Sequence, residues 1–339
     1  MKNASSYFRK VAYRAAALLP FNRLRSLARA ELVCVNYHSI KGWRGDALQA
    51  RQPYRTAEEF EKDILFLKHN YQLVTMEQLI AWKKEGWPLP PNSLFITIDD
   101  GLKVVYDKMF PILEKHGIKP ALFINPAFVD NADLHYRRKA DMLLAFCSAH
   151  EEKGQRLNAF MKEKGLNEEF DHLLANIKYS DRALLDEMAG VLGFSYAEYL
   201  AREPVYLSST EIKELRNAGW IIGAHSMDHP PYKELSIEEQ VQQTLDSVSY
   251  VSEHFDAPCR LMAYPSNDSG LSLALFDETA RGCDLSFGVQ GLKKDVVPNH
   301  IHRIALEGSG VSAPTALKTA YLKYTIQKLF NKTVHQRDA

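Results

Sequence analysis

Segments typical of β-strands alternate with segments typical of helices along most of the chain, and this alternation restricts the possible folds more than any other feature. Apolar runs predict strands at 32–38, 71–75, 94–99, 121–126 and 220–226, and around Arg260, Asp284 and His302. Repeated strand–helix units with short links predict an α/β fold with a mainly parallel sheet. The C-terminal ends of its strands face one mouth, so side chains that follow strands are the first candidates for a functional site.

Capping boxes predict where several helices begin. In each box a Ser or Thr lies three residues before a Glu, as in Thr56 with Glu59, Ser208 with Glu211, and Ser236 with Glu239. Between residues 130 and 205 the pattern changes to helical segments rich in Leu, Ala, Lys and Glu. Because strand–helix units flank this stretch on both sides, we interpret it as a helical insertion into one barrel-like domain. The expected parts are a basic amphipathic segment at 1–30, a barrel at 31–310 with the insertion at about 130–205, and a basic helix at 311–339.

Charged residues balance over the whole chain but are distributed unevenly along it. Forty-two Lys and Arg residues match 42 Asp and Glu residues, so no net charge favours a nucleic-acid partner. The first 30 residues contain no acid but carry Lys2, Arg9, Lys10, Arg14, Arg23, Arg25 and Arg29. Near the other end, Leu317, Tyr321, Tyr324 and Leu329 lie among Lys318, Lys323, Lys328 and Lys332. Two interpretations stay open: both ends contact an anionic membrane surface peripherally, or two solvated terminal helices pack on the domain.

The sequence predicts a cytoplasmic location. The apolar stretch Ala15–Phe21 makes a poor signal peptide, because it is short, contains Pro20 and is followed by arginines. No run approaches the length of a membrane span. The four cysteines are widely spaced, with no CxxC pair that would indicate a redox or zinc motif. Any peripheral membrane contact is therefore expected at the inner membrane face.

The segment LFITIDDG, Leu94 to Gly101, ends a buried strand with two adjacent acids. Two ionised neighbours at the mouth of a barrel repel each other and lose hydration, so a positive group should lie beside them. The alternative is structural, with Asp99 or Asp100 as the N-cap of the helix that begins near Val104. This segment alone favours the structural alternative.

A second segment, GAHSMDH, places His225 and His229 four residues apart just after another expected strand. On one turn of helix this spacing lets two imidazoles reach one ion. Such a pair is also common in the core or on the surface of proteins without metal. Two histidines and one carboxylate at a barrel mouth would form an open metal site, and this donor set suits Zn²⁺ among the divalent ions.

Three further strand ends carry polar or unusual residues. Tyr264 and Pro265 end one strand in AYPSND, where a plain turn is the alternative. NHIHRIAL holds His300, His302 and Arg303 before the last strand, and VNYHSI ends the first strand with His38. Taken singly, each of these residues is explained as well by a structural role as by a functional one.

Together, VNYHSI, ITIDDG, NAGWIIGAHSMDH and MAYP resemble, in order and spacing, the polysaccharide deacetylases of the NodB-homology type, carbohydrate esterase family four. The resemblance covers roughly residues 31–130 and 205–306 and implies a distorted (β/α) barrel. It implies that Asp99 is the general base and that Asp100, His225 and His229 hold a divalent metal. It also implies an oxyanion site around Tyr264, Pro265 and Ser266, where the Ser266 backbone N–H would assist the metal.

The chain departs from the family pattern in three ways. The third motif lacks the usual arginine beside the base, and Arg303 is the expected substitute. Ser266 and Asn267 stand where many relatives have an aromatic residue and a glycine, which should alter the floor of the sugar pocket. The histidine that acts as general acid is not fixed, since His302 lies in the matching turn, His300 is next, and His38 is an alternative from the first strand.

These features predict a metal-dependent hydrolase that removes an N-acyl group, most simply N-acetyl, from an amino sugar of a polysaccharide or a glycolipid precursor. A deformylase or an O-acetyl esterase would use the same metal chemistry on a related glycan. A different class is a carbohydrate-binding protein that kept the fold and lost turnover. The joint presence of Asp99, Asp100, His225 and His229 favours an enzyme.

Overall fold

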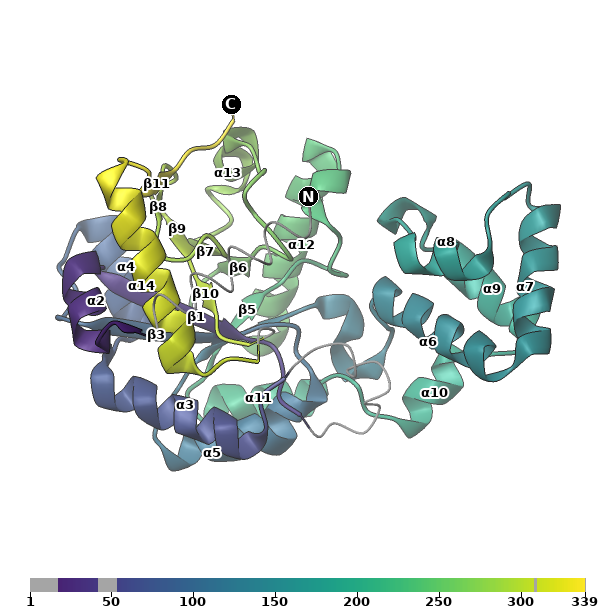
Figure 1. Ribbon diagram of the computed structural model, residues 1–339, viewed down its shortest axis with the longest axis horizontal. Helices are drawn as coiled ribbons and strands as arrows, with labels where there is room; N and C mark the ends of the chain where they lie inside the picture. Colours follow the sequence, from purple (N-terminus) through teal and green to yellow (C-terminus); the bar gives the residue numbers. More distant parts are fainter. Residues whose placement is uncertain (1–17, 42–53, 308–309, 339) are drawn as a thin grey trace.

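A parallel sheet that nearly closes into a barrel forms the centre of the molecule (Figure 1). The computed structural model describes residues 18–41, 54–307 and 310–338. The strands of the sheet follow the order β10-β1-β3-β4-β5-β6-β7-β9, and every neighbouring pair is parallel. They are β1 (Leu32–Tyr37), β3 (Ser93–Ile98), β4 (Ala121–Ile124), β5 (Ile221–Ala224), β6 (Leu261–Ala263), β7 (Leu285–Gly288), β9 (His300–His302) and β10 (Ile304–Ala305). Only Arg303 separates β9 from β10, so the two ends of this order meet and the expected (β/α) barrel is confirmed.

Helices surround the sheet, and the capping boxes predicted from the sequence start them as expected. Thr56, Ser208 and Ser236 cap α3, α11 and α12, and the sequence analysis missed a fourth box, Thr75 with Gln78, at α4. The surrounding helices are α3 (Ala57–Asn70), α4 (Met76–Glu85), the π-helical turn η1 (Val105–Met109), α5 (Phe110–Lys115), α11 (Ser209–Asn217), α12 (Ile237–Phe255), α13 (Leu273–Thr279) and α14 (Ala313–Leu329). The expected strand at 71–75 shrinks to β2 (Gln72–Leu73), which pairs with β3 at the edge of the path.

Alternation along the strands separates two apolar layers. Side chains such as Phe95, Phe123, Phe287 and Ile301 fill the barrel interior, while their neighbours in sequence pack outward against the helices. Asp99 continues the inward series of β3 that contains Phe95, and Arg303 continues that of β9 after Ile301. Both charged side chains therefore point into the barrel interior, at the C-terminal ends of the strands.

The stretch between β4 and α11 forms a separate helical lobe on one side of the barrel (Figure 1). It contains the 3₁₀ turns η2 (Pro126–Asn131) and η3 (Tyr179–Asp181) and the helices α6 (Tyr136–Ala149), α7 (Glu151–Glu163), α8 (Phe170–Asn176), α9 (Leu184–Leu192) and α10 (Tyr196–Arg202). This lobe corresponds to the expected insertion. The division of the chain into functional parts stays a prediction.

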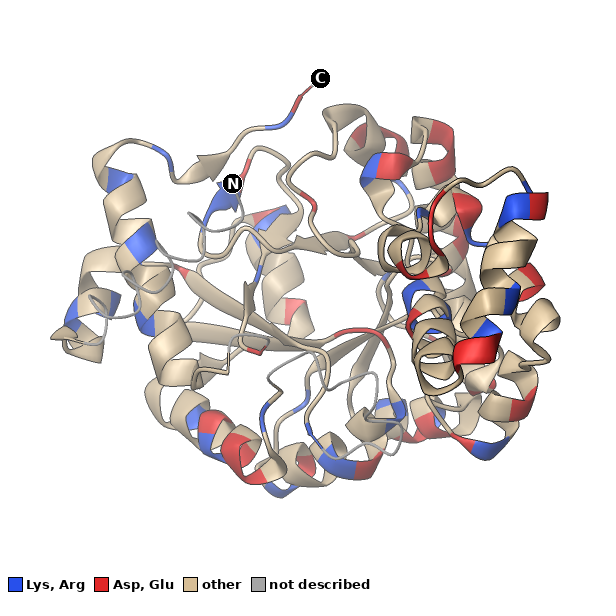
Figure 2. Cartoon of the chain, turned by 45° about the vertical axis from the view of Figure 1, so that its right-hand side comes forward, with Lys and Arg blue, Asp and Glu red and all other residues tan. Residues whose placement is uncertain are grey.

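The two basic ends of the sequence lie side by side in the structure. Helix α2 (Phe21–Ala28) packs on α14, where Phe21 meets Tyr321 edge to face and the Lys328 ammonium donates to the Ala28 carbonyl. Neither helix contains an acid, and Figure 2 shows Lys and Arg without Asp or Glu along them at the left of the view. The expected segment at 1–30 is described only from residue 18, so its first 17 residues lie outside the described part.

The chain ends with a short strand, β11 (Val334–His335), that pairs with β8 (Lys294–Asp295). This tail crosses the outside of β9, where the direct link from β9 to β10 leaves no place for a covering helix. Among the helices that the structure describes, none has the length and apolar character needed to cross a membrane.

Candidate active site

Asp99 and Asp100 end β3 at the mouth of the barrel, but their backbones behave differently. The Asp99 N–H still donates to the Tyr37 carbonyl of β1 at 2.9 Å, so this residue extends the strand. Asp100 and Gly101 then adopt left-handed backbone angles, with φ of 74° and 61°. A side chain at Gly101 would be strained, and its Cβ would also lie 3.2 Å from Ile124 Cγ2. The turn therefore sends two adjacent carboxylates in different directions.

Asp100, His225 and His229 converge in a way that suits a metal ion. Asp100 Oδ1 lies 3.5 Å from His225 Nε2 and 3.6 Å from His229 Nε2, distances too long for good hydrogen bonds. Ligand atoms of a tetrahedral zinc ion stand roughly 3.3 Å apart when each bond is about 2.0–2.1 Å. Asp100 Oδ1 is also buried, without a hydrogen-bond partner among the described residues. A bound cation would satisfy this oxygen and both imidazoles.

The two histidines reach this position from a loop, so the expected turn of helix is wrong. Residues 225–229 follow β5 without helical structure, because Ser226 and His229 have φ of 65° and 60°. The His225 Nδ1 atom is 2.7 Å from the Ala263 carbonyl, which fixes the proton on Nδ1 and leaves the Nε2 lone pair for a metal. Burial lowers the pKa of His225 to about 4, which also keeps the ring neutral.

Asp99 forms a buried ion pair with Arg303. Its Oδ1 lies 2.7 Å from Arg303 Nη1, and the same nitrogen donates to the Thr97 hydroxyl at 3.0 Å. Both charged side chains are almost completely buried. Burial alone would raise the pKa of Asp99, but Arg303, His225 and His38 outweigh it and lower the pKa. Arg303 thus occupies the place that the sequence analysis assigned to it.

His38 lies on the other side of Asp99 and is held by Glu307. The His38 Nδ1 atom contacts Glu307 Oε1, and Glu307 Oε2 accepts the Ser39 N–H at 3.0 Å. The other ring nitrogen, Nε2, is 3.7 Å from Asp99 Oδ2. Burial opposes protonation of His38, but Glu307, Asp100 and Asp99 together raise its pKa to about 10. His38 therefore stands beside Asp99 as a protonated group.

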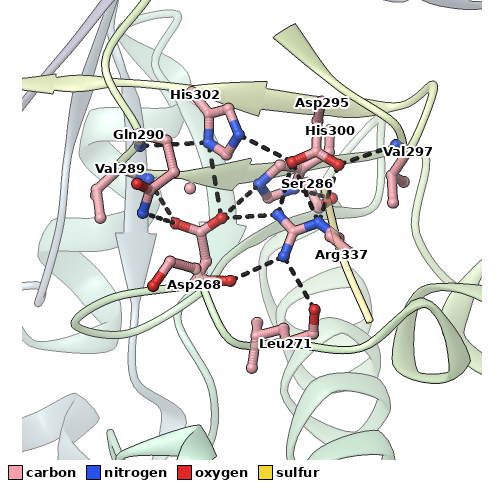
Figure 3. Close-up of polar contacts among 12 residues, drawn as sticks. Asp268, Leu271, Ser286, Val289, Gln290, Asp295, Val297, His300, His302 and Arg337 are labelled. Atoms are coloured by element: carbon pink, nitrogen blue, oxygen red, sulfur yellow. Dashed lines mark hydrogen bonds and ion pairs between the residues drawn. The ribbon is translucent and has the colours of Figure 1, made fainter. Parts of the chain in front are cut away.

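His302 and His300 point to the opposite face of β9 and join a different cluster (Figure 3). His302 Nε2 is 2.9 Å from Asp295 Oδ2, and its Nδ1 accepts the Gln290 N–H at 3.3 Å. His300 lies 3.1 Å from Asp268 Oδ2, and its side chain, like that of His302, is fully buried. The structure thus separates His302 from Asp99, although Arg303 follows it directly.

Arg337, from the C-terminal tail, supplies the positive charge of this second cluster (Figure 3). Its Nη2 atom lies 2.8 Å from both Asp268 Oδ2 and Asp295 Oδ2, while Nε donates to Asp295. Nη1 donates to the main-chain carbonyls of Asp268 and Leu271. The acids and histidines could otherwise serve as metal ligands. Because the guanidinium already bridges both carboxylates with all of its donors engaged, this cluster is a structural lock.

The residues of the expected oxyanion site differ in burial. The Tyr264 side chain is buried outside the sheet, with its ring centroid 5.4 Å from those of Tyr232 and Phe276. Pro265 is buried, whereas Ser266 is exposed with φ of 59° in the loop after β6. The structure therefore brings the aromatic ring into the core, away from the Asp99 group.

Several residues at the mouth were not singled out from the sequence. Glu307 follows β10 and binds His38, which follows the neighbouring strand β1. A cavity next to Asp100 and His229 is lined by Asn125, His135, Arg138 and Tyr206 among others, and the last three come from the insertion or its edges. No local pattern marks these residues, since only the closed barrel and the folded insertion bring them next to His38, Asp100 and His229.

A protein-family model matches this chain. The family model described as polysaccharide deacetylase matches residues 87–275, more than half of the 339 residues. Among curated relatives, the poly-beta-1,6-N-acetyl-D-glucosamine N-deacetylase of Staphylococcus epidermidis is 31% identical over 81 residues, which are 24% of this chain and 28% of the relative. The Staphylococcus aureus enzyme of the same name is 32% identical over 78 residues, or 23% and 27% of the two chains. The alignments thus span less than a third of either relative.

Solved structures show the same fold at low identity. A Streptococcus pyogenes deacetylase, PplD, superposes with a TM-score of 0.55 at 14% identity and covers 85% of this chain and 97% of its own. IcaB from Ammonifex degensii gives a TM-score of 0.52 at 17% identity, with 86% and 97% covered. The fold therefore extends over nearly the whole of each of these relatives.

We expect the Arg337→Met variant to lose roughly 3–5 kcal/mol of unfolding free energy, because two buried carboxylates lose their cation. Urea denaturation at pH 7 measures this loss. Burial would raise the pKa of Asp295, but hydrogen bonds from His302 and Arg337 lower it. The stability that ionised Asp295 contributes is fully present above its pKa in the unfolded chain and is lost as pH falls through its pKa in the folded protein. The difference in unfolding free energy between wild type and Arg337→Met should therefore become smaller in acid.

The control is Gln336→Met, an exposed neighbour that should change stability by no more than about 0.5 kcal/mol. Equal unfolding midpoints for wild type and Arg337→Met would show that the C-terminal tail does not stabilise the barrel beside β9.

Proposed function

Because the chain belongs to the polysaccharide deacetylase family, we propose that it is a metal-dependent hydrolase that removes an N-acyl group, in the first place N-acetyl, from an amino sugar of a glycan. The observation that carries the proposal is the convergence of Asp100, His225 and His229 beside the buried pair of Asp99 and Arg303. A binding protein without turnover would need neither an ionised base nor an open metal site next to it.

Asp100, His225 and His229 are the proposed ligands of a divalent cation, and two imidazoles with one carboxylate favour Zn²⁺. When bound, such an ion lowers the pKa of a coordinated water and polarises the acyl carbonyl. Asp99 accepts the proton of the attacking water, while Arg303 holds its carboxylate in place and in the ionised form. The water oxygen bonds to the acyl carbon, and the bond from that carbon to the sugar nitrogen then breaks.

We assign the general acid to His38, the alternative to His302 left open by the sequence. His38 Nε2 lies 3.7 Å from Asp99 Oδ2, and Glu307 favours the protonated ring. A proton from His38 to the departing nitrogen releases the free amino sugar together with acetate. His302 is already engaged by Asp295 and Gln290 in the lock around Arg337. For the oxyanion we retain only the Ser266 backbone N–H, since the Tyr264 ring lies in the core.

The proposed substrate is a polymer or oligomer of N-acetylglucosamine. Support comes from the two staphylococcal relatives, which are poly-beta-1,6-N-acetyl-D-glucosamine N-deacetylases. A deformylase or an O-acetyl esterase would use the same residues on a related glycan, because the pocket sets the leaving group. A glycolipid precursor would present the same amino sugar close to a membrane.

Acetate release tests the function directly. We expect metal-loaded wild type to release acetate from N-acetylglucosamine oligomers. The Asp99→Asn variant should bind the same amount of metal but lose roughly 10²–10⁴-fold in kcat, since the base is gone. Asp100→Ala should lose the metal itself, and chelation of wild type followed by addition of Zn²⁺ should remove and restore activity.

Elemental analysis and an acetate assay on the same samples separate the alternatives. Formate from N-formyl substrates or acetate from O-acetyl sugars, without release from N-acetyl oligomers, would point to the other hydrolases. Metal in wild type and in Asp99→Asn, with no product from any of the three substrate types, would leave the binding protein. Wild type prepared without chelator and still free of metal would overturn the ligand assignment.

The Arg303–Asp99 pair predicts a shift in pH dependence. In Arg303→Gln, burial acts on Asp99 with less opposition, so the pKa of Asp99 should rise. The acidic limb of the kcat/KM profile should then move to higher pH by the same amount, with a larger rate loss at pH 6 than at pH 8. Arg303→Lys keeps the charge and should shift the limb less. An unmoved limb in Arg303→Gln would mean that Asp99 is not the base.

We further propose that the paired ends of the chain contact an anionic lipid surface. The face formed by α2 and α14 exposes Leu27, Ile326, Leu329 and Phe330 by 47–77% and contains Lys and Arg but no acid. Apolar side chains surrounded by cations suit an interface with anionic headgroups. We assign the contact to the cytoplasmic side, whose leaflet carries such lipids.

The position of this face bears on the substrate. Ala28 and Lys328 lie together just before β1 begins, whereas the metal ligands follow the C-terminal ends of β3 and β5. A membrane contact at α2 and α14 would leave the mouth at the opposite end of the barrel. This arrangement favours a glycan that extends from the surface over a sugar attached directly to a lipid.

Vesicle pelleting measures the membrane contact. Wild type should sediment with phosphatidylglycerol vesicles more than with phosphatidylcholine vesicles, and less at high salt. A double variant, Leu329→Ser with Phe330→Ser, should lose most of this binding because both side chains leave the apolar face. Trp87→Ser is the control, since Trp87 is 65% exposed outside this face. Sedimentation that is equal for both lipids, or unchanged in the double variant, would contradict the proposal.

A further inference from the structure

The helical insertion forms one wall of the cavity above the proposed metal site. Asp100, His229 and Asn125 line this cavity from the barrel, while His135 and Arg138 line it from the start of the insertion. Tyr206, where the insertion returns to the barrel, completes the wall. A substrate bound in this cavity would therefore touch residues that the barrel itself does not supply.

The base of the insertion is tied to the turn that carries Asp100. The Leu207 N–H donates to the Gly101 carbonyl at 2.9 Å, and the Lys103 N–H donates to the Val205 carbonyl at the same distance. The Asn131 side chain joins the two ends of the insertion, because its oxygen accepts the N–H groups of Val205 and Tyr206. The wall and the metal ligands therefore belong to one hydrogen-bonded unit.

His135 is held in this wall by contacts to its main chain and to its ring. Its N–H donates to the Tyr206 hydroxyl at 3.2 Å. The ring packs edge to face on the ring of His229, with centroids 4.9 Å apart and planes at 89°. Phe128 lies on another side, with its centroid at 6.3 Å. These contacts leave the imidazole little freedom to turn.

The Nε2 atom of His135 is buried and has no hydrogen-bond partner among the described residues. An unsatisfied buried polar atom destabilises a folded protein, so the position of this nitrogen next to the cavity points to a ligand that completes it. An imidazole nitrogen can accept or donate one hydrogen bond with a sugar hydroxyl, according to the tautomer of the ring.

We propose that His135 is a substrate-contacting residue, whose Nε2 forms a hydrogen bond with a sugar hydroxyl next to the reacting acylamino group. The His135 ring packs on that of His229 and both residues line the same cavity, so a sugar bound there lies beside both. The insertion then selects the sugar, while the barrel provides the chemistry. This inference rests on the proposed deacetylase function and names the part of the substrate that the insertion reads.

Monodeoxy substrates test this contact. Acetate release is measured for a di-N-acetylglucosamine substrate and for its monodeoxy analogues, with wild type and with His135→Phe. Phe keeps the edge-to-face packing on His229 and removes the nitrogen. We expect kcat/KM of the variant to fall roughly 10- to 100-fold on the full substrate, as for a site built to bind a hydroxyl. On one analogue, which lacks the hydroxyl that His135 binds, wild type and variant should agree within about threefold.

Two controls separate this contact from a structural role. His172→Phe makes the same substitution at an exposed histidine of α8 and should leave kcat/KM unchanged on the full substrate and on the analogues. Elemental analysis should give equal metal in wild type and His135→Phe. Loss of metal in His135→Phe, an equal loss of rate on every analogue, or a rate within twofold of wild type on the full substrate would each overturn the inference.

Failure of the proposed function has a different signature, which is no product from wild type. In that case calorimetry on the Zn²⁺-loaded proteins replaces the rate. Binding of the same disaccharide that weakens about tenfold or more in His135→Phe, but not in His172→Phe, supports the contact. Equal binding by wild type and His135→Phe, or no binding by wild type, overturns it.

Discussion

The ion pair between Asp99 and Arg303 is the interaction on which the site depends. Two adjacent carboxylates at the end of a buried strand are tolerable only if cations meet both of them. Arg303 meets Asp99 at 2.7 Å from the link between β9 and β10, and Asp100 turns away to face the two histidines. The barrel must therefore close, with β10 beside β1, before Asp99 can stay ionised in its interior.

Strand β9 connects this pair to the lock on the outside of the barrel. Because side chains alternate along a strand, His302 points outward to Asp295 while Arg303 points inward to Asp99. Arg337 holds Asp295 and Asp268 from the C-terminal tail, where other strands are covered by a helix. The last residues of the chain thus fix the strand that positions the arginine of the site. Gly288 makes room for this lock, since a Cβ there would lie 2.3 Å from Asp268 Oδ2.

The sequence predicts those parts of the fold and site that depend on local pattern. Strand ends carry Asp99, Asp100 and His225, and a parallel barrel brings strand ends together, so periodicity predicts that these side chains meet at one mouth. Their roles as base and proposed metal ligands came from the resemblance to the family. The helical turn expected around His229 was wrong. Ser226 and His229 have left-handed backbone angles, and an i, i+4 spacing of two histidines does not reveal them. The choice between His38 and His302 required the pleat of β9, whose register no motif encodes.

What the sequence could not supply are contacts between segments that are distant in the chain. The basic ends look like two separate features until α2 and α14 pack in one layer and form a single face without acids. The insertion likewise looks like an addition outside the family pattern, and only its return beside Gly101 shows that it completes the cavity. A barrel that supplies the metal ligands can keep its chemistry while the loops above it change. In this chain the part beside the barrel mouth is a helical lobe, and at its base the Nε2 atom of His135 is buried next to the cavity without a hydrogen-bond partner among the described residues. The specificity of the site is therefore expected to depend on the lobe.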